Sequence, residues 1–230
     1  MTNKTLIIGL CLVSLICGCK RKRKLETWEK REQRYEDKTP EEWVKLIQNP
    51  RQVVRREAAR RLIYGGEEVV PMLIEAFEKN KRGGVRLSIA RVFGDMGPTA
   101  APAVPALCQA LKDKNWAERD VAAETLGKVR SNPEETLPAL TDALKDTESR
   151  VRIKAAEAIA RLRPNAPDII AALIENLEDE DENVRANTCD ALGAIGPPAN
   201  SAVPALQKLT KQESVIVQMA ADEALRKINR

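Results

Sequence analysis

Apolar and small residues recur along most of the chain with the period of amphipathic helices. In VRIKAAEAIARLR, residues 151–163, positions 0, 4, 8 and 11 counted from Val151 are apolar or small, which places one stripe on a helix. A second apolar stripe precedes it in LPALTDALKD, residues 137–146. The pattern therefore predicts a pair of helices, here named the A helix and the B helix, each with one apolar face.

This pair of stripes is repeated along the chain. Copies of the B stripe begin at Val54, Val85, Glu118, Val151, Val184 and Val217, at spacings of 31 and then 33 residues. Leucines of the A stripe stand 33 residues apart at Leu107, Leu140, Leu173 and Leu206. One hairpin cannot bury both of its stripes alone, so a period of this length indicates stacked units. We predict an all-α solenoid of about six stacked helical hairpins over residues 40–230.

Capping and turn residues mark the boundaries of the predicted helices. An N-cap residue followed by proline at the first helical position predicts a helix start in units one and four. Glycine tolerates a left-handed backbone and proline cannot continue a helix, so a Gly-Pro pair predicts a helix end. The starts are Thr39-Pro40 and Asn132-Pro133, and the ends are Gly97-Pro98 and Gly196-Pro197.

The N-terminal segment has the pattern of a signal peptide. Lys4 precedes an apolar run over residues 6–16, and small residues follow up to Cys19. The run is shorter than the roughly 20 apolar residues of a membrane span. The segment Ile16-Cys17-Gly18-Cys19 resembles a bacterial lipobox, which implies cleavage after residue 18 and lipidation of Cys19. We expect residues 1–18 to be a signal peptide.

The basic run from Lys20 to Lys24 leaves the location of the solenoid open. Beside acyl chains these five cations would strengthen binding to anionic lipids, although they could also be a solvated spacer. Cations after an apolar run also favour a cytoplasmic body held by an uncleaved signal-anchor. We expect residues 19–39 to form a charged tether, and the protein to be lipid-anchored on the extracytoplasmic, periplasmic side of the cell membrane.

The repeated patterns resemble a known family. The A pattern PxLxxAL and the B pattern VRxxAAxALGxIG are similar to HEAT repeats, particularly the short bacterial HEAT-like kind of PBS lyases, with the best match over residues 184–196. The resemblance implies a right-handed α-solenoid whose B helices line the concave side and bind proteins. Glu118 in place of valine and Gln218 in place of arginine depart from the pattern.

Position 6 of the B stripe changes character along the stack. A solvated surface explains such a column, and so does a bipolar groove that orients a protein partner with a basic segment. We take the second as a hypothesis for partner binding. The residues are Arg60, Arg91, Glu124, Glu157, Asp190 and Glu223.

Position 1 of the B stripe is arginine in five units. A row of cations could bind phosphates, but a residue repeated in every unit more often serves the repeat itself. We therefore expect these arginines to pair with acidic or carbonyl groups of helix turns, such as those of Asp113, Asp146 or Asp179. The arginines are Arg55, Arg86, Arg119, Arg152 and Arg185.

Composition argues against several classes of function. The chain has no histidine, so the commonest general base and the commonest metal ligand are missing. Aromatic residues make up only 3% of the chain. Residues 40–230 contain 28 cations and 29 anions, which is not the basic footprint that nucleic acid needs. We expect Cys108 and Cys189 to be too far apart for a disulfide and Cys189 to be a buried, inert thiol.

These patterns favour a scaffold over an enzyme. We expect a non-catalytic, membrane-tethered adaptor that binds a protein partner and needs no metal, cofactor or nucleic acid. The alternatives are a HEAT-like lyase-type protein that acts on a cofactor-bearing partner, and a cytoplasmic HEAT adaptor held by the signal-anchor.

Overall fold

Helical hairpins form the repeating unit of the computed structural model, which describes residues 38–211 and 214–230. The A helices of units one to six are α3 Pro40–Ile47, α5 Val70–Lys79, α7 Val104–Ala110, α9 Pro133–Ala143, α11 Pro167–Asn176 and α13 Val203–Leu209. The B helices are α4 Gln52–Leu62, α6 Gly83–Met96, α8 Trp116–Val129, α10 Ser149–Leu162, α12 Glu182–Ile195 and α14 Val215–Ile228. Short 3-10 helices, η2 Glu67–Val69, η3 Gly97–Ala103 and η4 Pro197–Ala202, precede three of the A helices. The predicted all-α solenoid of six hairpins is confirmed.

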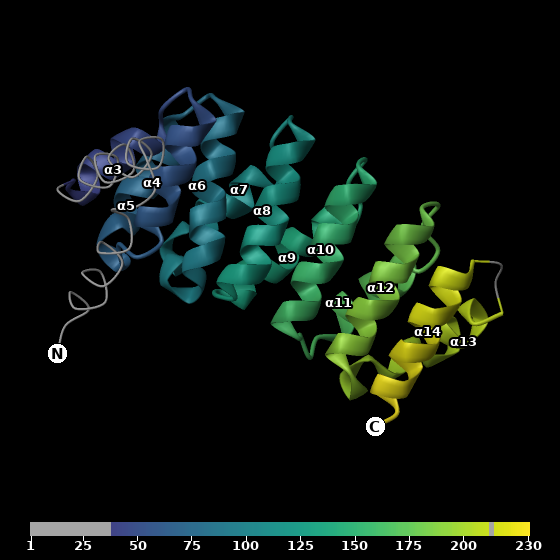
Figure 1. Cartoon of the computed structure of the whole chain (residues 1–230). Coiled ribbons are helices and arrows are strands. Elements are labelled where there is room, and N and C mark those ends of the chain that lie inside the picture. Colours follow the sequence, from purple (N-terminus) through teal and green to yellow (C-terminus); the bar gives the residue numbers. More distant parts are fainter. Residues whose placement is uncertain (1–37, 212–213) are drawn as a thin grey trace, which may run out of the picture. The chain divides into compact units, whose positions relative to one another are not determined.

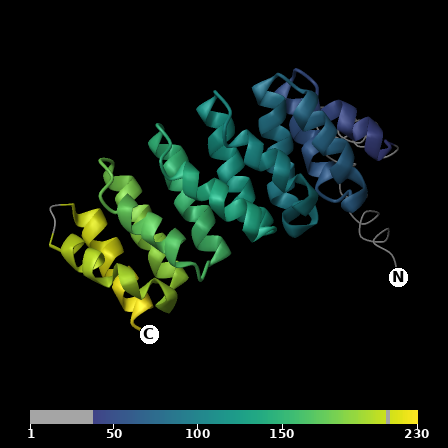
Figure 2. The same ribbon diagram turned by 180° about the vertical axis from the view of Figure 1, so that it is seen from behind.

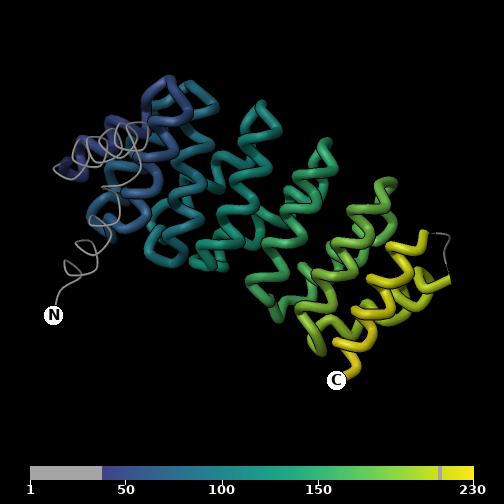
Figure 3. The backbone as a smooth tube through the Cα atoms, in the orientation of Figure 1, coloured from purple at the N-terminus to yellow at the C-terminus, as the bar shows by residue number. Residues whose placement is uncertain are grey.

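The two kinds of helix form two layers. The B helices lie side by side at the front of Figure 1 with the A helices behind them, and Figure 2 shows the same stack from the other side. The tube in Figure 3 follows the chain from one hairpin to the next. Successive B helices pack along much of their length, whereas successive A helices touch at few positions. The stack is therefore tightest on its B side, in agreement with the concave B side that the resemblance implies.

The predicted stripes form the core. The four A-stripe leucines, Leu107, Leu140, Leu173 and Leu206, are fully buried, as are Val151, Ala155 and Ile159 of the B stripe. Each stripe faces the partner helix of its own unit or the neighbouring unit. Burial of one such leucine or isoleucine stabilises the fold by roughly 1.5–3 kcal/mol, so most of the folding energy comes from contacts that cross between helices.

Glycines in two B helices allow neighbouring helices to approach closely. A Cβ atom built on Gly127 of α8 would lie 2.7 Å from the Cα of Ala158 in α10, and one built on Gly193 of α12 would lie 2.9 Å from the Cα of Ala224 in α14. Both distances are shorter than any ordinary carbon contact, which has its optimum at about 3.5–4.0 Å. Position 9 of these two helices must therefore lack a side chain.

The helix ends confirm most of the predicted boundaries. α3 begins at Pro40 and α9 at Pro133, and Gly97 and Gly196 have φ angles of 61° and 79°. The predicted side-chain cap of Asn132 is wrong, because this residue has a left-handed backbone (φ 48°, ψ 58°) and its side chain makes no capping bond. The start of α9 is secured instead by the Thr136 hydroxyl, which donates to the carbonyl of Ser131 at 2.9 Å.

The predicted signal peptide, Cys19 and the basic run from Lys20 to Lys24 lie outside the described residues. Within residues 38–211 and 214–230, no helix combines the length and the apolar character that crossing a bilayer requires.

Candidate functional site

The six position-6 residues lie one on each B helix, from α4 to α14, on the outward side of the B layer. Arg91 and Asp190 are exposed, and the side chain of Arg60 is 69% exposed. The side chains of Glu124, Glu157 and Glu223 are partly covered, at 32%, 28% and 44% exposure. The structure therefore brings the column to one surface, which we call the B surface.

Cations on the same helices neutralise most of the acidic column. Lys128 lies 2.8 Å from Glu124, Lys154 lies 3.0 Å from Glu157, and Lys227 lies 3.4 Å from Glu223. A hydrogen bond from Lys128 lowers the pKa of Glu124, against the desolvation that raises it. The B surface is thus a mosaic of both signs rather than a purely acidic strip.

Asp190 differs from the other acidic members of the column. The position four residues later is Ala194 rather than a lysine or arginine, and no ion pair of Asp190 occurs among the described residues. Desolvation raises the pKa of Asp190, while nearby Lys227 lowers it and Glu223 raises it. This carboxylate is the part of the column most available to a cation from outside.

Exposed apolar side chains gather on the same layer. Trp116 begins α8 with its ring 5.5 Å from the guanidinium carbon of Arg150, which is a cation–π contact. In the described part of the chain, every large apolar side chain that is exposed lies on a B helix or just beyond one. They are Val53, Tyr64, Trp116, Val215, Ile216 and Met219. The stripe pattern did not predict these exposed side chains, although Ile216 and Met219 lie outside the buried positions 0, 4, 8 and 11.

The position-1 arginines serve the repeat, as predicted. Nε and Nη2 of Arg119 donate to Asp146 at 2.6 and 2.7 Å, while Nη1 donates to the carbonyl of Asp113 at 2.8 Å. Arg152 repeats this geometry with the Asp179 carboxylate, at 2.7 and 2.8 Å, and with the Asp146 carbonyl. Arg119 and Arg152 thus connect the loops of consecutive units and are not free to bind phosphates.

Glu118, the departure from the repeat pattern, belongs to the same network. It is buried and forms an ion pair with Arg86, which also pairs with Asp113 at 3.4 Å. The guanidinium carbon of Arg86 lies 4.7 Å from the centre of the Phe77 ring. Burial raises the pKa of Glu118, against the effect of Arg86. The extra acid therefore serves as a second partner for Arg86.

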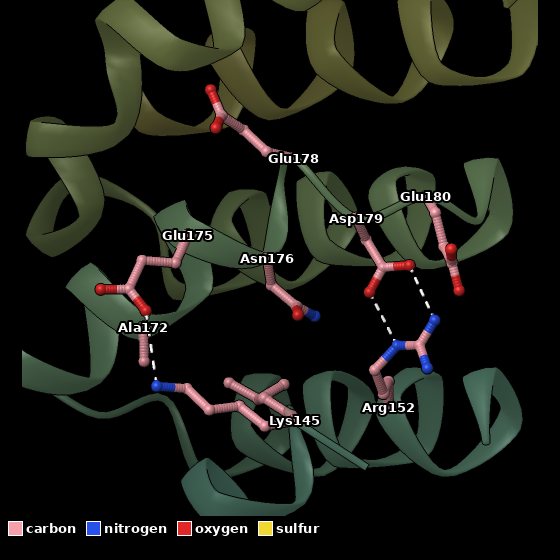
Figure 4. A pocket seen from close by; sticks show the side chains of 9 residues that line it. Lys145, Arg152, Ala172, Glu175, Asn176, Glu178, Asp179 and Glu180 are labelled. Carbon is pink, nitrogen blue, oxygen red and sulfur yellow. Dashed lines mark hydrogen bonds and ion pairs between the residues drawn. The ribbon is translucent and has the colours of Figure 1, made fainter. Parts of the chain in front are cut away.

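A cavity of about 440 Å³ opens between units four and five, beside these loops (Figure 4). Arg152 and Asp179 pair across its wall, and Lys145 lies 3.6 Å from Glu175. The buried amide of Asn176 donates to the hydroxyl of Thr188 at 3.3 Å. Because its two cations, Arg152 and Lys145, already pair with acids of its wall, the cavity belongs to the loop network.

The thiols have the environment of structural cysteines. Cys189 is fully buried, as predicted, and burial raises its pKa to about 12. Cys108 is partly exposed, and burial raises its pKa to about 11. Both remain protonated at neutral pH and are therefore poor nucleophiles. No group of three or more Cys, Asp or Glu in the described ranges is arranged to hold a metal ion.

Comparison with protein families decides the classification. A model described as HEAT repeats matches residues 104–169 and 170–230, and a model described as PBS lyase HEAT-like repeat matches residues 85–113. The chain belongs to the HEAT-repeat family. The comparison with curated protein sequences found no match.

Solved structures share the fold of this HEAT-repeat protein. An engineered protein is 24% identical with a TM-score of 0.59, covering 83% of this chain and 96% of that one. A designed armadillo repeat protein in complex with the peptide (KR)4 is 20% identical with a TM-score of 0.59, covering 83% and 99%. The complex of CpcE and CpcF of phycocyanin lyase from Nostoc sp. PCC7120 matches at 23% identity with a TM-score of 0.58, covering 66% and 96%. Identities this low show a common fold.

Proposed function

We propose that this HEAT-repeat protein is a non-catalytic scaffold that binds a protein partner along its B surface. The observation that carries the proposal is the distribution of large apolar side chains that are exposed in the described ranges, all of which lie on a B helix or just beyond one. Aromatic and apolar anchors surrounded by polar groups are typical of protein interfaces. Trp116 with Arg150, and Ile216 with Met219, supply such anchors beside the charged column.

The charges of the B surface suit a partner that has a basic segment. Glu124, Glu157, Asp190 and Glu223 present four carboxylates, of which Asp190 has no cation paired with it in the described chain. The designed armadillo neighbour is in complex with the basic peptide (KR)4, which supports this choice of ligand chemistry. Arg60 and Arg91 at the other end of the column would fix the direction in which the partner lies.

A membrane tether is part of the proposal. The lipobox-like segment ending at Cys19 and the basic run from Lys20 to Lys24 support a lipid anchor on the extracytoplasmic side of the cell membrane. A tether of this kind would restrict the scaffold to partners at or near that surface.

Crosslinking of the full-length protein in its native membrane, followed by capture and mass spectrometry, tests the scaffold. One variant carries Glu124→Lys, Glu157→Lys, Asp190→Lys and Glu223→Lys. A control variant carries four similar reversals on exposed acids of the A helices, namely Glu78→Lys, Glu134→Lys, Asp142→Lys and Asp168→Lys. We expect the wild type and the control to recover the same partner, and the B-surface variant to lose it.

Other results would reject parts of this proposal. Equal recovery by the B-surface variant would remove the acidic column as the binding site. The absence of any partner with the wild type would remove the scaffold function itself.

The match to the PBS lyase HEAT-like repeat favours one other candidate function. A lyase-type protein that acts on a cofactor-bearing partner would carry the chromophore with it during capture. The same purified sample therefore separates the two, because visible absorbance that copurifies with the protein supports the lyase type, and a colourless complex supports the scaffold.

A further inference from the structure

One turn of α14 presents three apolar side chains to solvent. Val215, Ile216 and Met219 are 64%, 55% and 68% exposed, and together we call them the apolar patch. Met219 lies three residues after Ile216 and four after Val215, and side chains at these spacings are neighbours on a helix, so the patch is continuous through Met219. Exposed apolar groups that are contiguous indicate an interaction site, whereas scattered ones do not.

The apolar patch is not simply the contact surface for another repeat. In α6, α8, α10 and α12, position 5 is a buried Ala or Cys, and positions 9 of α8 and α12 are the glycines that permit close approach. In α14 the corresponding residues are Asp222 and Arg226, and both are exposed. A further hairpin could not pack here as the inner units do, because a charged side chain occupies each point of close contact.

The apolar patch adjoins an acidic segment of unit five through Glu182. The hydroxyl of Ser214, directly before α14, donates to a carboxylate oxygen of Glu182 at 2.7 Å and joins the start of α14 to the start of α12. Glu180 and Glu182 are exposed, and the side chain of Glu178 is 78% exposed, with Lys208 as its cation partner. We call Glu178, Glu180 and Glu182 the acidic rim. The neighbouring positions of α12 and α14 can be followed in Figure 1.

We propose that the apolar patch and the acidic rim together bind a partner segment in which a run of Lys or Arg is followed by bulky apolar residues. This inference rests on the proposed function and identifies the end of the B surface at which the partner is anchored. The cations would lie against the acidic rim, and the apolar side chains would cover Ile216 and Met219. Complementary charge sets the direction of the segment, and apolar burial supplies most of the affinity.

Neither half of the site is sufficient alone. An exposed ion pair contributes little affinity in water, so a basic segment without apolar residues would bind weakly and be displaced by salt. Removal of apolar surface from water supplies affinity but has no direction. A ligand that satisfies both halves gains affinity and a fixed orientation.

The chain itself contains a segment of this kind. Residues 20–28, KRKRKLETW, have five cations followed by Leu25 and Trp28. To bring Leu25 and Trp28 to α14 in unit six of the same molecule, the chain would have to cross about five repeats from unit one, or roughly 40–50 Å. Residues 29–39, which would bridge this distance, span at most about 40 Å when fully extended. We therefore assign the occupant to a separate partner protein, and residues 20–28 serve as a probe of the right chemistry.

Fluorescence anisotropy with a labelled synthetic peptide KRKRKLETW and the full-length protein in detergent tests the inference. We expect binding that weakens about tenfold in the variant Ile216→Ser with Met219→Ser, and about tenfold in Glu180→Lys with Glu182→Lys. Matched controls at the other end of the stack are Val53→Ser and the pair Glu67→Lys with Glu68→Lys, which should leave the affinity unchanged. Circular dichroism verifies that each variant is folded.

Four results would overturn the inference. The first is that the wild type does not bind the peptide, and the second is that a peptide with Leu25 and Trp28 replaced by serine binds as tightly as the original peptide. The third is that the control variants lose as much affinity as the site variants. The fourth is that the protein binds the peptide more tightly when its own Lys20 to Lys24 are replaced by serine. The last would show that the protein's own segment occupies the site. Loss of the peptide site with the crosslinked partner still captured would leave the proposed function intact, whereas peptide binding without any captured partner would reject the scaffold.

Discussion

Arg119 connects two consecutive units through one guanidinium group. Its Nη1 bonds to a carbonyl of its own loop, while Nε and Nη2 bond to the carboxylate of Asp146 in the next loop. The repetition of arginine at position 1 predicts that such a partner exists. It does not predict that one side chain bonds to both loops at once, because this depends on where the next unit's loop lies.

Arg119→Lys should destabilise the solenoid more than Arg185→Lys. Lysine cannot form the bidentate bond, and the Arg119 and Asp146 side chains are only 12% and 10% exposed. Arg185 is a matched control, because its Nη1 bonds to the carbonyls of Asp179 and Glu180 but its Nε has no hydrogen-bond partner among the described residues. We expect an additional loss of about 1–2 kcal/mol for Arg119→Lys in urea unfolding. Equal losses would contradict the role of the carboxylate.

The pH dependence of the same pair gives a second measurement. Burial raises the pKa of Asp146, but hydrogen bonds from Arg119 and the Glu148 amide outweigh it, and the net pKa lies below 3.8. A carboxyl whose pKa is lowered by folding stabilises the protein above its unfolded pKa and loses this contribution as the pH falls through its folded pKa. The difference between the wild type and Arg119→Lys should therefore shrink below about pH 4.

The acidic residues at position 6 show that one aligned position of the repeat does not describe the charge of the surface around it. Position 6 alone suggests a strip of four negative charges, yet the cations that neutralise it stand three or four residues away on the same helix, as Lys128 does for Glu124. These pairs were present in the sequence at i, i+3 or i, i+4 spacing. Asp190 is the exception because Ala194 replaces the cation, and this could also have been predicted by comparing two columns instead of one.

At the scale of helices, most of the fold could be predicted. The 33-residue period, the proline starts and the glycine ends follow from local rules that tertiary contacts do not override. Asn132 is the N-cap residue of α9 as predicted, but its side chain makes no capping bond, because asparagine also tolerates the left-handed backbone that it has here. The close contact of α8 and α10 was not predicted, because a glycine in a helix pattern does not show which neighbouring helix approaches it.

Gly127→Ala should destabilise the protein although alanine favours helices. The helix propensity of alanine would add about 1 kcal/mol, but its Cβ would lie 2.7 Å from the backbone of Ala158 and force α8 and α10 apart. Overpacking of this kind costs about 1–3 kcal/mol and more where backbone is displaced. We expect a lower Tm in thermal unfolding followed by circular dichroism.

Gly94→Ala is the control for that substitution. Its added Cβ would meet the Cδ of Lys128 at 3.1 Å, and a flexible side chain can move away from it. We expect a Tm equal to or above that of the wild type. A similar decrease in both variants would show that glycine is needed for another reason than the approach of the next helix.

At the scale of the whole molecule, the B surface exists only when six hairpins are stacked. Each helix supplies a few exposed residues, and no stripe in the sequence shows which apolar side chains remain uncovered once its neighbours are in place. Met219 is exposed and Ala186, at the corresponding position of α12, is buried. The architecture could therefore be predicted from the period, whereas the apolar anchors of the binding surface required the stacked structure.

The proposed tether predicts where the whole molecule lies in the cell. Cys19→Ser removes the acceptor of the lipid, and the basic run from Lys20 to Lys24 alone attracts anionic lipids by only about 1 kcal/mol per charge. We expect the wild type to be labelled with fatty acid and cleaved after residue 18, and this variant to lose both. Cys17→Ser, two residues earlier, is the control and should keep both. If Cys19→Ser leaves the mass and the membrane fraction unchanged, the apolar run over residues 6–16 is an uncleaved signal-anchor, and protease added to spheroplasts would then fail to reach the solenoid.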